Sequence, residues 1–218
     1  METRPSTGEV RRNALVALAV LLVERVVVSC LFVLKPGAML FPGIPAIAIV
    51  GFVFSWVIPP LIVYRIEKRD LRSLGLFVAK EHWARYGLYA IVGLVLPAVL
   101  VGVDRALLAD FVEQIVYIGV AEEVFSRGYL LTRLCDWLGK GRGLVLSALI
   151  FGLSHVVSLV SQHGLSYPMS DLMIFVQTFV GGLLLGYVYL RAKNVVPGSI
   201  AHVAGNLYIS RIGTLLSR

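Results

Sequence analysis

Charged residues are scarce in this chain of 218 residues, since Asp, Glu, Lys and Arg together make up only 15% of it. A soluble domain carries about a quarter. Hydrophobic residues reach 58% and the mean hydropathy is +0.84, values typical of an integral membrane protein in contact with membrane lipids. In such a protein the net charge of +7 bears on membrane topology, and no nucleic-acid partner is expected.

Cysteine is almost absent as well. The chain has only Cys30 and Cys135, both inside or beside apolar runs. Neither has a second Cys or a His at the spacing of metal ligands. A disulfide framework or a zinc ribbon is therefore not expected.

Apolar runs long enough to cross a bilayer, about 20 residues, are separated by Pro and Gly, which end helices. We expect an all-α fold, a polytopic transmembrane helical bundle of seven to eight spans that forms one integral membrane domain over residues 1–218. The predicted spans lie near residues 13–34, 44–64, 86–103, 110–132, 143–160, 171–191 and 195–216.

Basic residues collect in the connections on one side of these spans. They are Arg11, Arg12, Arg65, Lys68, Arg69, Arg72, Lys80, Arg85, Arg133, Lys140, Arg142, Arg191 and Lys193. The opposite connections hold few, Lys35 and Arg105, although Arg211 and Arg218 near the C-terminus do not fit the pattern. Because cytoplasmic loops carry an excess of Lys and Arg, we predict a cytoplasmic N-terminus and a C-terminus on the other side.

The longest of the basic connections, residues 65–85, alternates basic and apolar residues around Leu71–Phe77 and Trp83. This alternation is typical of a segment that lies in the headgroup region of a membrane. We interpret the connection as an anchored link between two spans.

Polar side chains inside three of the predicted spans need an explanation, because one ionised group at the centre of a membrane helix costs roughly 2.5–3.5 kcal/mol. With a rise of about 1.5 Å per residue, Glu122 lies roughly 16 Å, His155 roughly 20 Å and His202 roughly 14 Å from the basic end of its own helix. Three different helices therefore carry titratable groups at a similar depth. This agreement favours one shared site that faces the interior of the bundle.

Spacing within the fourth predicted span separates its two carboxylates. Glu123 and Arg127 are four residues apart and can pair along one helix face. Glu122 points about 100° away from that face and is left without this partner. We therefore expect Glu122 to be the carboxylate that is free to act as a general base or acid.

The same four-residue spacing recurs on two later spans. His202 and Asn206 lie on one face of the last span, so both can address the same atom. Phe151 and His155 share a face of the fifth span. A lone His in a membrane helix is more often a packing or hydrogen-bonding residue than a catalytic one, but the joint pattern favours a site.

Other polar residues are less informative. Glu24 and Arg25 are adjacent, and adjacent residues of a helix do not face each other, so each is expected to need a partner on another helix or at the interface. His82 and His163 fall in predicted loops and are expected to be solvated.

Three motifs follow one another in order on the fourth, fifth and seventh predicted spans: Glu122-Glu123-x-x-x-Arg127, Phe151-x-x-x-His155 and His202-x-x-x-Asn206. In type and order they resemble the three motifs of the CPBP intramembrane protease family, which includes the type II CAAX-prenyl endopeptidases and the bacteriocin-immunity (Abi) proteins. The core that carries these motifs covers about residues 110–212. The first three spans are compatible with the family and carry none of its motifs.

The resemblance implies a glutamate-dependent endopeptidase that works within the membrane. Glu122 would act as the general base on a water molecule that His155 helps to hold. His202 and Asn206 would form the oxyanion hole. The supporting residues would be Glu123, Arg127 and Phe151. The implied substrate is a membrane-tethered or prenylated peptide or protein, cut near its C-terminus, and the short loops suggest a prokaryotic cell membrane.

Alternatives to this mechanism follow from the same residues. Glu122, His155 and His202 have the donor types of a divalent metal site, but a metal site leaves Asn206 unexplained, so we expect no cofactor. A non-enzymatic immunity or scaffolding protein would use the motifs as a polar clamp between helices. A proton-coupled transporter would use the carboxylates and histidines as a relay, although no inverted repeat is evident.

Overall fold

The computed structural model describes residues 5–35, 37, 39–41 and 44–216, and most of them are helical. Within this part of the chain, five helical segments are long and apolar enough to cross a membrane. They are Thr7–Leu34, Ala46–Arg65, Lys80–Val101, Lys140–His163 and Pro168–Ala192. The chain is thus a helical membrane protein, while the count of seven to eight spans and the orientation of the N-terminus stay predictions.

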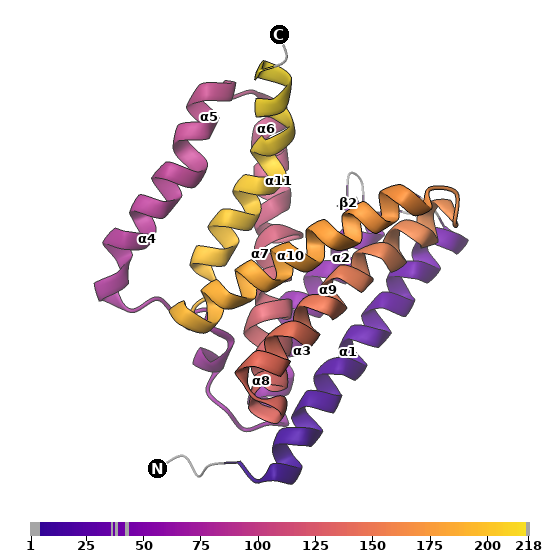
Figure 1. Ribbon diagram of the computed structural model, residues 1–218, viewed down its shortest axis with the longest axis vertical. Coiled ribbons are helices and arrows are strands. Elements are labelled where there is room, and N and C mark those ends of the chain that lie inside the picture. The colour runs from indigo at the N-terminus through magenta and orange to yellow at the C-terminus, as the bar shows by residue number, and fades with distance from the viewer. Residues whose placement is uncertain (1–4, 36, 38, 42–43, 217–218) are drawn as a thin grey trace.

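The helices form two groups that flank a central column (Figure 1). On one side α1 (Thr7–Leu34), α9 (Lys140–His163) and α10 (Pro168–Ala192) pack together. On the other side lie α4 (Trp83–Ala90), α5 (Leu96–Val101), α6 (Arg105–Val116) and α11 (Val196–Leu216). The central column consists of α2 (Ala46–Phe52), α3 (Ile58–Arg65), α7 (Gly119–Glu123) and α8 (Thr132–Leu138).

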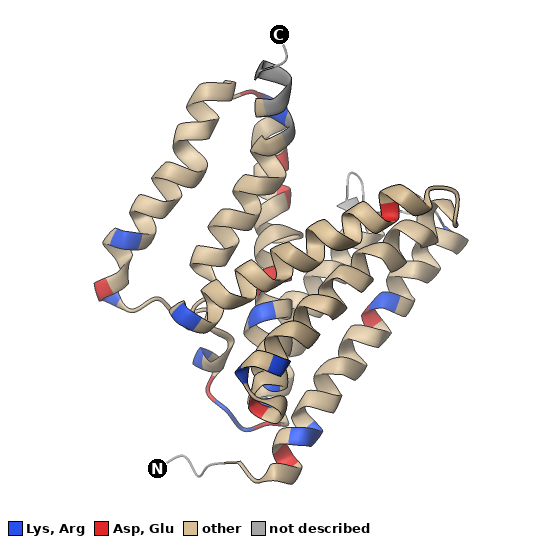
Figure 2. Cartoon of the chain, viewed as in Figure 1, with Lys and Arg blue, Asp and Glu red and all other residues tan. Residues whose placement is uncertain are grey.

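The two ends of the molecule differ. A short antiparallel hairpin, β1 (Met39–Phe41) and β2 (Ile44–Pro45), connects α1 to α2. Figure 2 shows most Lys and Arg residues toward the opposite end, where the N-terminus lies. We call these the hairpin end and the basic end. The distribution supports the prediction that the basic end is cytoplasmic.

Several predicted spans contain a wider π-helical turn. The turns η1 (Val53–Val57) and η4 (Ile91–Val95) each lie directly before an α segment with a proline at its first or second position, α3 and α5. Pro lacks the N–H that would bond four residues back, and its ring displaces that carbonyl. The helix therefore widens ahead of the proline and continues.

The predicted span 110–132 is wrong as a single helix, because α6 ends at Val116 and α7 begins at Gly119. Ile118, with φ −119° and ψ −86°, leaves the helical region, and the indole nitrogen of Trp56 donates to the carbonyl oxygen of Val116 at 2.8 Å. A Cβ atom on Gly119 would lie 2.8 Å from the Val203 side chain. The break is thus fixed by close packing against α11 and by a hydrogen bond from η1.

The connection after α3 does not simply lie at the membrane surface. Leu74, in the 3₁₀ turn η2 (Leu71–Leu74), is fully buried. A Cβ atom on Gly128 would lie only 2.3 Å from the carbonyl oxygen of Leu74, so the connection packs directly against the central column at a position that only glycine permits. The backbone N–H of Val195 donates to the carbonyl of Gly75 at 3.0 Å. The segment therefore belongs to the core of the basic end.

Arg133 was expected in a basic loop, but it lies in α8 and is 0% exposed. Its guanidinium donates to the Glu67 carboxylate, with a closest distance of 2.7 Å, and to the carbonyl of Gly128 at 3.2 Å. A buried arginine needs such partners, because an unpaired charge in a low-dielectric interior is costly. The pair fastens the connection after α3 to the central column.

Arg211, which did not fit the topology prediction, is paired at the hairpin end. Its guanidinium contacts the carboxylates of Asp110 and Asp104, both on or beside α6. The two acidic residues neutralise this cation, so Arg211 adds no net positive charge to the hairpin end.

The α9–α10 pair is held at both its middle and its end. A Cβ atom on Gly182 would lie 3.1 Å from the Cα of Ala148, so small residues allow the two backbones to approach closely. His163, predicted to be a solvated loop residue, ends α9, and its Nε2 lies 3.4 Å from Oδ1 of the buried Asp171 on α10. The prediction for His163 was wrong, because the turn brings the start of α10 back over the end of α9.

Candidate active site

The break at residues 117–118 positions the two adjacent carboxylates. α7 starts directly after it, so Glu122 and Glu123 lie in its first turns, and the backbone N–H of Glu122 donates to the carbonyl of Ile118 at 2.7 Å. The helix then continues as the π-helical segment η5 (Val124–Leu131), which contains Arg127. Such segments are rare and occur frequently at functional sites.

Glu123 is fully buried and has two partners. Its Oε1 lies 3.1 Å from Nη1 of Arg127, the predicted pair, and 2.9 Å from Nδ1 of His202. The second contact was not predicted, since it depends on how α11 packs against α7. Because a carboxylate accepts, Nδ1 of His202 carries the hydrogen and Nε2 is turned away from Glu123.

Glu122 faces two imidazole rings that come from two other helices. Its Oε2 lies 3.8 Å from Nε2 of His202 and 4.0 Å from Nε2 of His155. Both distances exceed that of a hydrogen bond, and this oxygen has no hydrogen-bond partner among the described residues. The predicted agreement in depth is thus present in the structure: three helices bring Glu122, His155 and His202 together.

The orientation of His155 is set within α9. Its Nδ1 lies 2.9 Å from the carbonyl oxygen of Phe151, which can only accept, so the hydrogen is on Nδ1 and Nε2 faces Glu122. The Phe151 ring packs edge-on against His155 at 4.6 Å and His202 at 6.3 Å between centroids. The guanidinium of Arg127 lies over the same ring, 4.2 Å from its centroid, a cation–π contact. Phe151 therefore holds three of the polar residues in place.

Asn206 is oriented differently from the expectation. Its Nδ2 donates to Oε1 of Gln114 at 2.7 Å, and the residue is exposed. The structure gives it no described contact with Glu122 or His155. Gln114 was not among the residues predicted from the sequence. It accepts this hydrogen bond from Asn206 only because α6 packs against α11.

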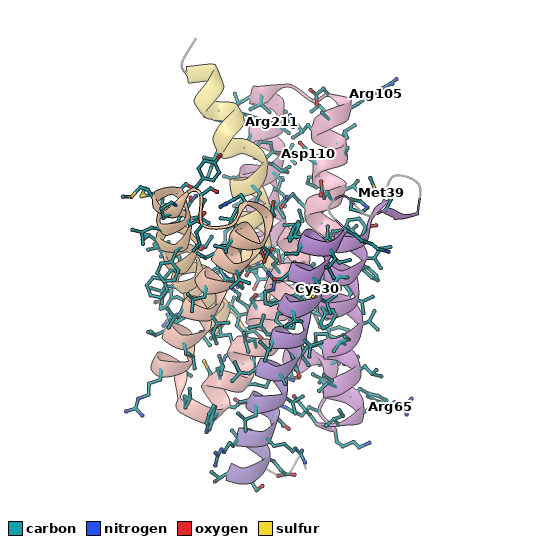
Figure 3. All side chains as sticks on the ribbon, turned by 90° about the vertical axis from the view of Figure 1, so that its right-hand side faces the viewer. Cys30, Met39, Arg65, Arg105, Asp110 and Arg211 are labelled. Atoms are coloured by element: carbon teal, nitrogen blue, oxygen red, sulfur yellow. The ribbon has the colours of Figure 1, made fainter. Side chains whose placement is uncertain are left out.

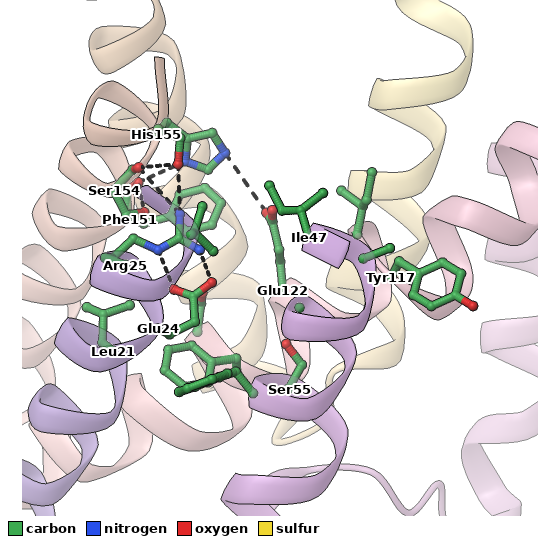
Figure 4. Close-up of a pocket in the computed structure, with 18 of the residues that line it drawn as sticks. Leu21, Glu24, Arg25, Ile47, Ser55, Tyr117, Glu122, Phe151, Ser154 and His155 are labelled. Carbon is green, nitrogen blue, oxygen red and sulfur yellow. Dashed lines mark hydrogen bonds and ion pairs between the residues drawn. The ribbon is translucent and has the colours of Figure 1, made fainter. Parts of the chain in front are cut away.

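A cavity of about 310 Å³ lies beside Glu122 and His155, between α1, α2, α7 and α9 (Figure 4). Its polar lining comes from Glu24, Arg25, Ser55, Glu113, Glu122, Ser126, Ser154, His155 and Ser158. The His202 side chain is only 12% exposed and does not line this cavity. Glu122 and His155 are thus the two motif residues other than Phe151 that the cavity wall presents.

Glu24 and Arg25 form part of the same wall. Contrary to expectation, they contact each other, because the long arginine side chain folds back onto the neighbouring carboxylate. Nη1 of Arg25 also donates to Oγ of Ser158 on α9 at 3.0 Å. The pair therefore ties α1 to α9 next to His155, as Figure 4 shows.

The candidate ligands for a divalent metal were Glu122, His155 and His202. A tetrahedral zinc ion bound at 2.0–2.2 Å would hold its ligand atoms about 3.3 Å apart. The Glu122 carboxylate oxygen lies farther than this from the two ring nitrogens, at 3.8 Å from His202 and 4.0 Å from His155. Among the described residues, no group of three or more His, Cys, Asp or Glu could hold a metal ion. The residues as placed do not fit a tetrahedral zinc site.

Comparison with known proteins bears on the half of the chain that carries the motifs. Residues 104–208 match the family model described as Type II CAAX prenyl endopeptidase Rce1-like. No curated protein and no solved structure gives a significant match. The matched region runs from the N-cap of α6 into α11 and contains every predicted site residue, which confirms the resemblance read from the motifs. Residues 104–208 are therefore similar to the Rce1-like type II CAAX prenyl endopeptidases, a family of proteases.

Proposed function

We propose that the protein is an intramembrane endopeptidase in which Glu122 activates a water molecule to attack a peptide bond. One observation carries the proposal. The Glu122 carboxylate lies at the wall of a cavity inside the helical bundle, and the Nε2 atoms of His155 and His202 face it at 4.0 and 3.8 Å. Groups at this separation are too far apart to bond directly, and one water molecule can bond to two of them at once.

In the proposed reaction, Glu122 takes a proton from the water molecule while the oxygen of that water forms a bond to the carbonyl carbon of the substrate's peptide bond. The neutral ring of His155 has a lone pair on Nε2, so it accepts the second hydrogen bond from the same water and fixes its direction. When the tetrahedral intermediate collapses, the carbon–nitrogen bond breaks. Glu122 then returns its proton to the leaving amine, so that proton and charge balance over the cycle.

His202 and Asn206 are the proposed donors to the oxyanion. Nε2 of His202 donates only when the ring carries a hydrogen on both nitrogens, and Glu123 supplies the acceptor for Nδ1–H in that form. Asn206 has a second amide hydrogen besides the one that it donates to Gln114. A donor of this kind is typically worth about 10²–10³ in kcat.

A membrane-tethered or prenylated substrate is supported by a second cavity, a groove of about 480 Å³ between α1 and α9. Its walls are almost entirely apolar, with Leu18, Leu21, Leu22, Val26, Ile150, Leu153 and Val157 among them. Leu21, Arg25 and Ser154 line both this groove and the cavity beside Glu122. A lipid chain in the groove would thus hold its attached peptide next to the proposed catalytic residues.

The direct test uses the detergent-purified protein and a farnesylated CAAX peptide, with and without EDTA. We expect the same cleavage rate in both samples, because the proposed base acts on water without a metal. Loss of cleavage in EDTA and recovery with added zinc would instead support the metal-dependent mechanism. The absence of cleavage for farnesylated, geranylgeranylated and unmodified peptides alike would favour the non-enzymatic alternative, in which the motifs clamp the helices.

Filling the groove should affect the lipid chain and spare the chemistry. Leu153→Trp places a larger ring in the groove, and we expect KM for the farnesylated peptide to rise about tenfold, comparable to the loss of one or two buried methylene contacts, while kcat is unchanged. Val145→Trp is the matched control, because Val145 is 53% exposed on the same helix and lies outside the groove. Equal KM values for the two variants would show that the groove does not hold the lipid chain.

A further inference from the structure

A pocket of about 650 Å³ lies at the basic end of the molecule. It is lined by the end of α3, by the turn that follows and by the connection up to Phe77. It shares no lining residue with the cavity beside Glu122 or with the groove between α1 and α9. Pockets that hold small ligands have volumes of roughly 300–1,000 Å³, so this one is large enough for the headgroup of a lipid.

The pocket forms because the chain reverses direction at Lys68. The backbone N–H of Arg69 donates to the carbonyl of Val63 at 3.0 Å, which closes the end of α3. Lys68 itself has a φ of 54°, in the left-handed region that few residues other than glycine adopt. The reversal brings the 3₁₀ turn η2 back against α3.

Two of the three cations in the pocket wall have no counter-charge. Arg69 donates to the Asp136 carboxylate on α8 at 2.9 Å, which fixes one side of the pocket. Arg65 and Lys68 are exposed, and within the part of the chain that the structure describes neither forms an ion pair. In Figure 3 the Arg65 side chain points away from the helices at the basic end, opposite Met39 of the hairpin.

The carboxylate in the pocket wall, Asp70, already has partners of its own. Its Oδ1 accepts from the backbone N–H of Arg72 at 2.7 Å, and its Oδ2 lies 3.9 Å from Nε of the same residue. These contacts cap η2 and leave Arg65 and Lys68 without a neutralising group. The pocket therefore presents a net positive charge to a ligand.

Apolar side chains form the rest of the wall. Tyr64 and Phe77 are 62% and 60% exposed, and Leu71 is half-buried. Tyr64 lies at the end of the apolar segment Ala46–Arg65, where a membrane helix meets the headgroup layer and Tyr is enriched. Basic residues at the C-terminal end of a helix are favourable by themselves, but that effect does not require exposed apolar side chains in the same pocket. The combination suits an amphipathic ligand.

We propose that this pocket binds one phospholipid with an anionic headgroup. The headgroup phosphate accepts hydrogen bonds from Arg65 and Lys68, and the adjoining part of the lipid lies against Tyr64 and Phe77. Basic pockets beside membrane helices on the cytoplasmic side bind such headgroups, and the basic end is the predicted cytoplasmic side. A soluble phosphate would use the two cations and leave the apolar wall without a role. The site does not depend on the proposed peptidase activity.

The test measures lipid binding to the detergent-purified, full-length protein by native mass spectrometry. Phosphatidylglycerol is compared with phosphatidylcholine that has the same acyl chains, and we expect tighter binding of phosphatidylglycerol. Arg65→Gln combined with Lys68→Asn should weaken this binding about 25-fold, or about fivefold for each cation removed. Asn replaces Lys68 because it tolerates a positive φ. Arg65→Gln alone, with an expected fivefold loss, reports if the double variant fails to fold.

Arg85→Gln combined with Lys80→Asn is the matched control. It removes the same two charges from exposed positions in the same connection, outside the pocket, and should leave the affinity unchanged. Equal losses in the two double variants, or equal affinities of the wild type for the two lipids, would overturn the proposal.

A further comparison separates a lipid from a free anion. Phe77→Ala should weaken phosphatidylglycerol binding about tenfold through the lost apolar contact, and millimolar inorganic phosphate should not displace the lipid. Displacement by phosphate, together with an unchanged affinity of Phe77→Ala, would show a simple anion site and overturn the assignment to a lipid.

Discussion

Glu122→Gln should lower kcat for peptide cleavage by about a thousandfold, within the range of 10²–10⁴ typical of a lost general base, while KM changes little. The amide has nearly the shape of the carboxylate and cannot take a proton from water. KM should be preserved because the cavity and the groove beside it keep their shape. The measurement is steady-state cleavage of the peptide by the purified variant.

Glu81→Gln is the matched control for this substitution. Glu81 is exposed in the turn before α4 and lies outside the cavity, so the same chemical change there should leave kcat unchanged. A thermal unfolding midpoint equal to that of the wild type would show that Glu122→Gln is folded. An active Glu122→Gln protein would refute the assignment of Glu122 as the base and would leave His155 as the candidate base.

Arg133→Met should destabilise the protein by about 3–5 kcal/mol, the usual effect of removing one partner of a buried ion pair. Both side chains of the Arg133–Glu67 pair are 0% exposed, so the Glu67 carboxylate would be left charged in a low-dielectric interior. The carbonyl of Gly128 would also lose the guanidinium as a donor. The free energy of unfolding in mixed detergent micelles measures the effect.

Two further variants separate burial from charge. Arg69→Met removes an arginine whose ion pair with Asp136 is 30% and 37% exposed, and it should cost about 1 kcal/mol or less. Adding Glu67→Leu to Arg133→Met removes both charges and should recover most of the lost stability. If Arg133→Met were no worse than Arg69→Met, the buried pair would not be what holds the connection after α3 in place.

Part of the candidate site could be predicted from the sequence, because it depends on residue spacing within a single helix. The four-residue step from Glu123 to Arg127 places both on one face, and the structure has this ion pair at 3.1 Å. The depths of Glu122, His155 and His202 follow from a fixed rise per residue, and their side chains do meet. The same local reasoning failed for Glu24 and Arg25, because it ignored the reach of the arginine side chain.

The sequence by itself determined that this is a helical membrane protein, in which order its motifs follow one another, and that residues 104–208 are similar to the Rce1-like family. Only the tertiary structure decided where the predicted span 110–132 breaks, that His202 contacts Glu123, and that Asn206 bonds to Gln114. The physical reason is that helical periodicity is set by bonds between residues four apart. The rotation and depth of one helix against another are set by side-chain packing between residues far apart in the chain.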